Sequence, residues 1–112
     1  MKNLVVVISR DSMGGGSEDL GKILAKGFIN SLAELEHPPT SMIFFNSGAF
    51  LTAESSNVLE DLGKLQARGT EILTCGTCIN FYELAENPAA GIASNMPTIT
   101  KKMATADSVI NI

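Results

Sequence analysis

The sequence predicts an α/β protein with three layers, in which a mainly parallel five-stranded sheet lies between two layers of helices. Apolar segments typical of strands alternate with amphipathic helical segments, in the order βαβαβαβαβ. Strand–helix alternation at such short intervals requires right-handed crossovers and makes neighbouring strands parallel. The chain has 112 residues, without an evident linker or internal repeat. We therefore expect residues 1–112 to form a single domain with one buried core.

The first strand and the first helix have the clearest patterns. Leu4 to Ile8 is a continuous apolar run, which is typical of a strand covered on both faces. A helix is predicted from Ser17 to Glu36, with Ser17 as its cap, and the two prolines after His37 end it. Large apolar residues spaced by three and four define the face that this helix is expected to turn to the core: Leu20, Ile23, Leu24, Phe28, Leu32 and Leu35.

The other elements follow the same alternation, and the strand before the last helix has the weakest pattern. They are predicted in this order: a strand at Met42–Phe45, a helix capped by Asn57 and ended by Gly69, a strand at Glu71–Thr74, a helix at Cys78–Glu86, a strand at Ala90–Ala93, a helix at Pro97–Ala106 and a strand at Val109–Ile112. Ligands of open α/β sheets bind at the carboxyl ends of the strands. Here those ends are residues 9–16, 46–52, 75–78 and 94–97.

Composition excludes several classes of function. The formal net charge is −4, and the chain has no Trp, one Tyr and no cluster of Lys and Arg, so we expect no nucleic-acid binding. The first eight residues contain an apolar run of only five, Leu4 to Ile8, too short for a signal peptide or a membrane span. We therefore expect a cytoplasmic protein with reduced thiols and no contact with a membrane.

The glycine-rich segment Gly14–Gly16 resembles part of a phosphate-binding loop but departs from it. Ile23 stands where such a loop needs Ser or Thr to hold magnesium, and Glu18 and Asp19 would repel phosphates. We therefore reject a nucleotide site. The three glycines either serve a tight turn from strand to helix, or form a mobile, anion-accepting loop beside the cysteines.

Both cysteines of the chain, Cys75 and Cys78, lie three residues apart in the sequence EILTCGTCINF. A zinc site needs four ligands, and the chain offers two thiols and the distant His37, which is expected to be exposed rather than catalytic. We therefore expect no metal. A structural disulfide is disfavoured in a reducing compartment, whereas a pair of small buried hydrophobic residues remains open.

A reactive pair is the other interpretation of these cysteines. Cys75 would lie between the end of a strand and the start of a helix, where the helix dipole lowers the pKa of a thiol. Gly76 removes a side chain from this turn and exposes the sulfur. Thioredoxin-like oxidoreductases use the same chemistry, but their pair follows the first strand, and Thr77 stands here where they have proline. A dithiol oxidoreductase is therefore an alternative rather than the preferred function.

The segments NSGAFLTAESSNVLEDLGKLQARGTEILTCGTCINFYEL and GIASNMPTITKKM resemble the DsrE-like sulfur-transfer family. The similarity is closest to the carboxy-terminal domain of YedF-type proteins linked to selenium metabolism, and SRDSMGGGSEDLGKILAKGFINSL fits the same subgroup. This resemblance implies a five-stranded α/β/α fold and a homo-oligomer. It also implies that Cys75 receives sulfur as a persulfide, with Cys78 as its neighbour, and that no cofactor is needed.

The resemblance implies a sulfur donor or acceptor protein as partner, such as a cysteine desulfurase or a TusA-like carrier. YedF-type proteins usually carry an amino-terminal TusA-like domain, which this sequence lacks, and relatives tend to have Gly where it has Glu83. The residues expected to bind substrate or partner are Gly14, Gly15, Gly16, Gly76, Thr77, Phe50, Leu51, Ser94 and Asn95.

Self-association is predicted at one of these segments. Ala49, Phe50 and Leu51 form an apolar cluster without helical or strand period, which predicts a surface loop whose Phe50 and Leu51 contact another subunit near the cysteines. A non-catalytic oligomeric interaction module, in which the thiols are incidental, is therefore a third functional hypothesis.

Overall fold

The computed structural model describes residues 3–112, and a five-stranded sheet forms its middle layer. The strand order is β4-β3-β2-β1-β5, and every pair of neighbouring strands is parallel. The predicted fold class is confirmed, with a sheet that is parallel throughout. The strands are β1 (Leu4–Ile8), β2 (Ser41–Phe44), β3 (Glu71–Cys75), β4 (Ile92–Ser94) and β5 (Ser108–Asn111).

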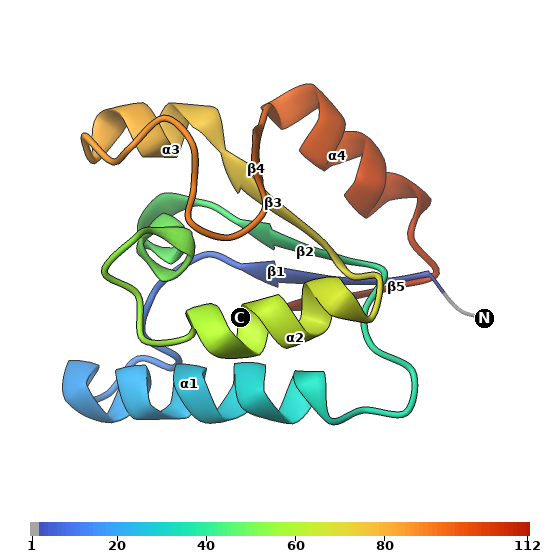
Figure 1. Cartoon of the computed structure of the whole chain (residues 1–112), viewed down its shortest axis with the longest axis horizontal. Coiled ribbons are helices and arrows are strands. Elements are labelled where there is room, and N and C mark those ends of the chain that lie inside the picture. Colours follow the sequence, from blue (N-terminus) through green and yellow to red (C-terminus); the bar gives the residue numbers. More distant parts are fainter. Residues whose placement is uncertain (1–2) are drawn as a thin grey trace.

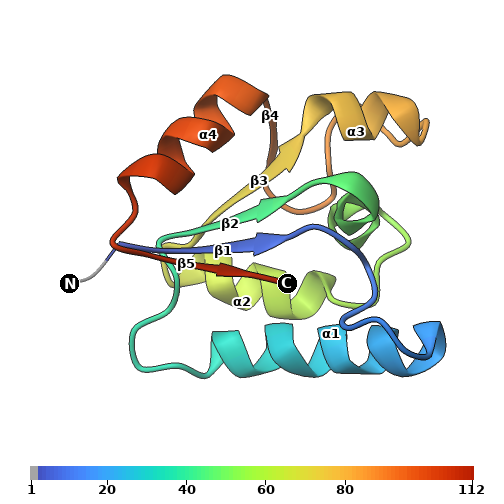
Figure 2. The ribbon, with the colours of Figure 1, turned by 180° about the vertical axis from the view of Figure 1, so that it is seen from behind.

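Helices cover both faces of the sheet. Helices α1 (Glu18–Ala33) and α2 (Leu59–Ala67) lie side by side on one face, and α3 (Gly76–Phe81) and α4 (Met96–Thr105) lie on the other (Figures 1 and 2). The larger apolar cluster joins the sheet to α1 and α2, and a smaller one joins it to α4. No helix within residues 3–112 has the length and apolar character needed to cross a membrane.

Helix α1 turns a partly different face to the core from the one predicted. Ser17 caps it as expected, because its hydroxyl accepts a hydrogen bond from the Leu20 amide. Of the predicted face, Leu32 is buried and Phe28 packs against the larger apolar cluster. The prediction is wrong for Leu20, Ile23 and Leu24, which are 53%, 69% and 47% exposed, and for Leu35, which lies exposed beyond the helix end. The helix approaches the chain too closely for large side chains, since a Cβ on Gly21 would lie 1.9 Å from the Ser12 hydroxyl oxygen. The buried residues are Gly21, Ala25, Ile29, Leu32 and Ala33.

The segment predicted as a surface loop is a short 3-10 helix, η1 (Asn46–Thr52). Ala49 is 1% exposed and Leu51 is 8% exposed, and Leu51 belongs to the larger apolar cluster. The expectation that these residues lie exposed on the surface is therefore wrong. A 3-10 helix has three residues per turn, so its buried positions do not follow the periods of α-helices or strands.

Other predicted boundaries also differ from the structure. Val58, without a side-chain hydrogen bond, stands at the cap of α2 in place of Asn57. Helix α3 begins directly after Cys75 and ends at Phe81, because Glu83 adopts a left-handed conformation with φ of 54°. Strand β4 and helix α4 lie slightly displaced from their predicted ranges, and Pro97 is in the first turn of α4 as expected.

Candidate functional site

The two cysteines lie at the carboxyl end of β3, and one of them is buried more deeply than the other. Cys75 is the last residue of β3 and is 2% exposed, whereas Cys78 lies in the first turn of α3 and is half-buried. Both are free thiols. Cys75 belongs to the apolar cluster under α4, and Cys78 packs against that cluster. The sequence placed the pair correctly, between a strand and a helix.

The pKa values of the two thiols shift in opposite directions. Burial raises the pKa of Cys75, but hydrogen bonds from the amides and side chains of Cys78 and Thr77 outweigh it, and the net pKa is lowered. Burial also raises the pKa of Cys78; the Asn46 amide opposes this, while the hydrogen bond to Cys75 and the Cys75 charge add to it. When the pair loses its first proton, the negative charge therefore lies on Cys75 and the remaining proton on Cys78.

The end of β4 closes the site beside Cys75. Ser94 is the register partner of Cys75, and a Cβ on Gly76 would lie 3.1 Å from the Ser94 carbonyl oxygen. Glycine at this position therefore permits the two chain segments to approach each other. Asn95, the next residue, caps α4 through its side chain, which accepts a hydrogen bond from the Thr98 amide.

The sequence analysis did not predict two further residues near the thiols, Asn46 and Tyr82. The Asn46 amide donates a hydrogen bond to the Cys78 sulfur at 3.0 Å, and the Tyr82 hydroxyl donates one to the Asn46 side-chain oxygen at 2.8 Å. Asn46 has φ of 52°, a left-handed conformation that asparagine tolerates better than most residues. An Asn directly after a strand was the only available signal, and it indicates a turn rather than a contact with Cys78.

Phe50 and Leu51, expected at a subunit interface, lie differently from each other. The ring centroids of Phe50 and Tyr82 are 4.6 Å apart, so Phe50 supports the residue that holds Asn46. Leu51 instead packs in the larger apolar cluster of its own chain. Of the two residues, only the half-buried Phe50 lies beside the thiol site.

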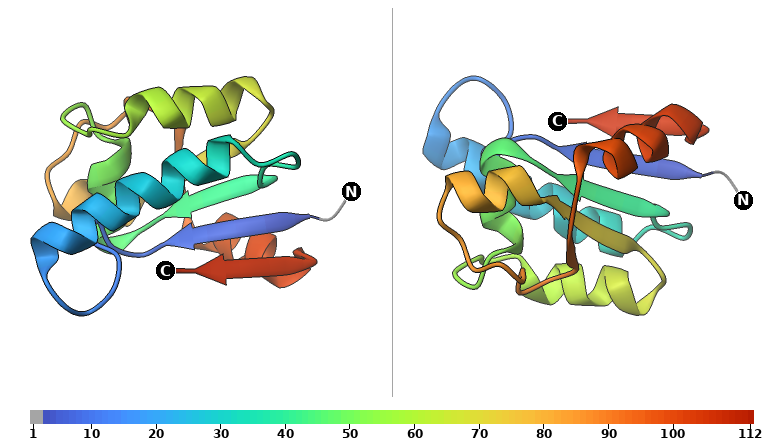
Figure 3. Two further views of the ribbon diagram at one scale, coloured as in Figure 1. Left: turned by 90° about the horizontal axis from the view of Figure 1, so that it is seen from below. Right: turned by 90° about the horizontal axis from the view of Figure 1, so that it is seen from above.

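The glycine loop lies apart from the thiols. Gly14, Gly15 and Gly16 are exposed at the carboxyl end of β1, and η1 lies between this loop and α3 (Figures 1 and 3). The loop contacts the side chain of Arg10, whose guanidinium donates a hydrogen bond to the Gly14 carbonyl oxygen. The structure thus brings Gly76, Thr77, Ser94, Asn95 and Phe50 towards the cysteines and leaves the three glycines at a distance.

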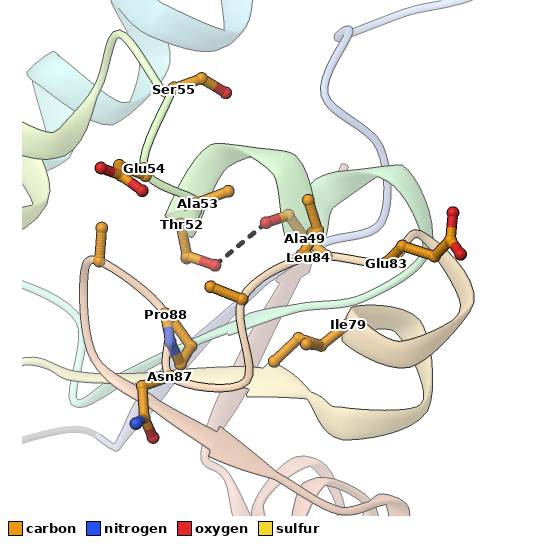
Figure 4. Close-up of a pocket in the computed structure, with 12 residues that line it drawn as sticks. Ala49, Thr52, Ala53, Glu54, Ser55, Ile79, Glu83, Leu84, Asn87 and Pro88 are labelled. Carbon is orange, nitrogen blue, oxygen red and sulfur yellow. Dashed lines mark hydrogen bonds between the residues drawn. The ribbon is translucent and has the colours of Figure 1, made fainter.

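Two hollows border this end of the sheet. A pocket of about 670 Å³ lies between the end of η1 and the segment after α3 (Figure 4), and neither cysteine lines it. Ile79 of α3 lines it, and the Thr52 hydroxyl beneath it donates to the Ala49 carbonyl oxygen. A more open groove of about 500 Å³ borders the apolar cluster that contains Cys75, and it is lined by Phe45, Met96, Thr100, Met103 and Ala104.

The described residues show no arrangement suited to a metal ion. Within residues 3–112, no three His, Cys, Asp or Glu side chains gather closely enough to hold one. The His37 side chain is 69% exposed and lies beside Glu36, far along the chain from either thiol, as expected for a surface residue.

Known structures share this fold at low sequence identity. The YchN protein of Escherichia coli superposes with a TM-score of 0.74 at 17% identity, covering 100% of both chains. MTH1491 of Methanobacterium thermoautotrophicum gives 0.68 at 17% identity over 97% of each chain. BT1422 of Bacteroides thetaiotaomicron gives 0.64 at 12% identity over 98% of this chain and 95% of its own. The latter two are described as proteins of unknown function. The α/β fold of this chain is therefore the fold of YchN.

Sequence comparisons add nothing to this likeness. No protein-family model matches the chain, and no curated protein matches it.

Proposed function

We propose that the protein is a small carrier of sulfur or selenium that holds the transferred atom as a persulfide, or its selenium equivalent, on Cys75. The observation that carries this proposal is the placement of two free thiols at the end of β3, with the pKa of the buried Cys75 lowered and that of Cys78 raised. Sulfur transfer needs a thiolate as the attacking group, and the lowered pKa increases the thiolate fraction of Cys75. The resemblance of the cysteine segment to the DsrE-like family supports the same function.

Loading follows from thiolate chemistry. The Cys75 thiolate attacks the outer sulfur of a persulfide on the donor, R–S–SH. A bond forms between Cys75 and that sulfur, the donor S–S bond breaks, and the donor leaves as the thiolate R–S⁻. The amides of Thr77 and Cys78, which hydrogen-bond the Cys75 sulfur, would hold the negative charge before attack.

Unloading can use the second thiol. Cys78, once deprotonated, attacks the Cys75 sulfur of the persulfide, which forms a Cys75–Cys78 disulfide and releases hydrosulfide. The mutual hydrogen bond of the thiols places the two sulfurs within reach of each other. Cys78 would therefore limit the lifetime of the loaded state when no acceptor takes the sulfur.

The donor would be a protein that presents a persulfide, such as a cysteine desulfurase or a TusA-like carrier. Cys75 is 2% exposed, so a donor has to displace part of its cover to reach it. The groove at Phe45, Met96 and Met103 borders the same apolar cluster and offers a surface against which such a donor could dock.

A dithiol oxidoreductase is the second candidate, and one specific observation favours it. Two neighbouring free thiols, one with a lowered pKa and one with a raised pKa, are also what thiol–disulfide exchange requires. The two functions differ in the species that accumulates on the protein. A carrier accumulates a persulfide, whereas an oxidoreductase accumulates only the Cys75–Cys78 disulfide.

Intact-mass analysis after incubation with a cysteine desulfurase and cysteine tests the proposal. The wild type is expected to gain one sulfur, about 32 Da, and Cys78→Ser is expected to keep that gain longer because the resolving thiol is absent. Cys75→Ser is expected to gain none. Loading of Cys75→Ser but not of Cys78→Ser would reverse the two roles. A protein that never gains sulfur but cycles a disulfide would be the oxidoreductase.

A further inference from the structure

We propose that Tyr82 is a positioning residue for the cysteine pair, and that it acts through Asn46 to hold the Cys78 sulfur in place. This inference rests on the proposed function, because it assigns the residues that position the thiol that resolves the persulfide. Within residues 3–112, the Tyr82 side chain forms no hydrogen bond with either cysteine. Its effect on the thiols therefore has to pass through Asn46.

The first step of the argument is the unusual backbone of Asn46. A non-glycine residue with φ of 52° has a costly conformation that surrounding contacts must maintain. This conformation accompanies a backbone amide that donates to the Cys78 sulfur at 3.0 Å. In the absence of such contacts, the chain after β2 would relax towards an ordinary conformation and withdraw the amide.

The second step is the side chain of Asn46. Its oxygen accepts a hydrogen bond from the Tyr82 hydroxyl at 2.8 Å, which connects the turn after β2 to the end of α3. Tyr82 packs against the half-buried Phe50, with ring centroids 4.6 Å apart, whereas the Phe81 ring, at 5.2 Å, is 79% exposed. The contact with Phe50 therefore supports Tyr82, which anchors Asn46 from the side-chain end.

The third step is the effect on Cys78. The Asn46 amide donates to the Cys78 sulfur and lowers the pKa of that thiol, against burial and Cys75, which raise it. Loss of this hydrogen bond should therefore raise the pKa of Cys78 further and leave its sulfur less well fixed.

Charged side chains do not explain the pKa shifts of the two thiols. The segments β2, η1, α3 and β4 that surround the pair contain no Asp, Glu, Lys or Arg at their carboxyl ends. Glu83 follows α3, and α4 carries Lys101 and Lys102, of which Lys102 pairs with Glu71 at the other end of β3. Neither thiol has any of these side chains among the causes of its shift.

The experiment measures the pH dependence of alkylation of each cysteine by iodoacetamide. Both cysteines lie on one tryptic peptide, residues 69–101, so fragment ions assign the label to each sulfur. Tyr82→Phe keeps the ring and removes the hydroxyl. We expect the midpoint of Cys78 to rise and its alkylation rate near neutral pH to fall roughly threefold to tenfold, as one pH unit corresponds to tenfold in thiolate. Thr105→Val, which removes a hydroxyl bonded to Lys101 on α4, is the control and should leave both midpoints unchanged.

Asn46→Gly separates positioning from a general structural effect. Glycine adopts φ of 52° without strain and keeps the amide, but it has no side chain for Tyr82 to hold. We expect its Cys78 midpoint to stay close to that of the wild type, and Tyr82→Phe to cause no further shift in the Asn46→Gly background, because the amide no longer depends on the tyrosine. An unchanged Cys78 midpoint in folded Tyr82→Phe, or an equal shift from Tyr82→Phe in the Asn46→Gly background, would overturn the proposal. Failure of sulfur loading in the wild type would refute the proposed function. The alkylation midpoints do not depend on sulfur loading, so they would still test the role of Tyr82.

Discussion

The hydroxyl groups of Thr52 and Thr74 lie 2.7 Å apart in the buried interior and connect η1 to the strand that ends at Cys75. Thr52 is 1% exposed and Thr74 is fully buried. The Thr52 hydroxyl also bonds the Ala49 carbonyl oxygen, and its own carbonyl oxygen accepts from the amides of Ala89 and Ala90. This connection fixes η1, which begins with Asn46, against the strand that carries the more deeply buried thiol.

Removal of one of these hydroxyls should destabilise the protein. We expect Thr74→Val to lower the free energy of unfolding by about 1–2 kcal/mol, because it leaves a buried hydroxyl of Thr52 short of a partner. Urea denaturation followed by circular dichroism measures this. Thr105→Val removes an exposed hydroxyl and is the matched control, for which we expect a change within about 0.5 kcal/mol. Equal midpoints for the two variants would contradict the structural role of the pair.

A substitution in the turn after α3 should instead stabilise the protein. Glu83 has φ of 54° and is exposed, so Glu83→Gly should relieve backbone strain without loss of buried contacts. We expect a gain of roughly 0.5–1 kcal/mol in the free energy of unfolding, after the greater flexibility of glycine in the unfolded chain is subtracted. Gly69→Ala, at φ of 96°, is the converse control and should destabilise by about 1 kcal/mol or more. A destabilised Glu83→Gly would mean that the carboxylate makes a contact that offsets the strain.

The two thiols should ionise in a fixed order as the pH rises. The lowered pKa of Cys75 means that its thiolate forms at lower pH than that of an ordinary thiol, and the raised pKa of Cys78 means that it ionises later. Alkylation midpoints in the folded wild type should therefore place Cys75 first, although it is the more buried residue. In concentrated urea both midpoints should converge near the ordinary thiol value of about 8.5. The reverse order in the folded protein would contradict the assignment of the charge to Cys75.

Self-association remains a prediction, and we now expect it at another surface. Leu51 lies in the core, whereas Leu20, Ile23 and Leu24 form an exposed apolar stripe on α1. We expect light scattering at micromolar concentration to give an oligomer for the wild type. Ile23→Glu should shift it towards the monomer, because the substitution puts a charge in the stripe.

Lys26→Glu changes charge on the same helix outside the stripe and should leave the oligomer intact. A wild type that scatters as a monomer would refute self-association. An oligomer unaffected by Ile23→Glu would place the interface elsewhere.

The sequence predicted the elements better than their packing. The alternation of strands and helices, the position of Ser17 as a cap and the turn at Cys75 could be derived from local patterns, because each depends on neighbours in the chain. The buried face of α1 could not, since a close approach at Gly21 selects small residues and leaves large ones outside. The contact of Asn46 with Cys78 spans 32 residues of sequence, and no local pattern encodes it.

The parallel pairing of β5 with β1 determines where a fused segment would leave the molecule. Ile112 follows β5 and is tied to β1 by hydrogen bonds to Val7 and from Ser9, at the same end of the sheet as Cys75. Two strands stand between β5 and β3, so three strand spacings of about 4.8 Å, or roughly 14 Å, separate their backbones. An affinity tag or reporter domain attached after Ile112 would therefore stand beside the approach to the thiols and obstruct a docking donor. The same tag placed before β1 would emerge from the opposite end of the sheet and leave that approach open.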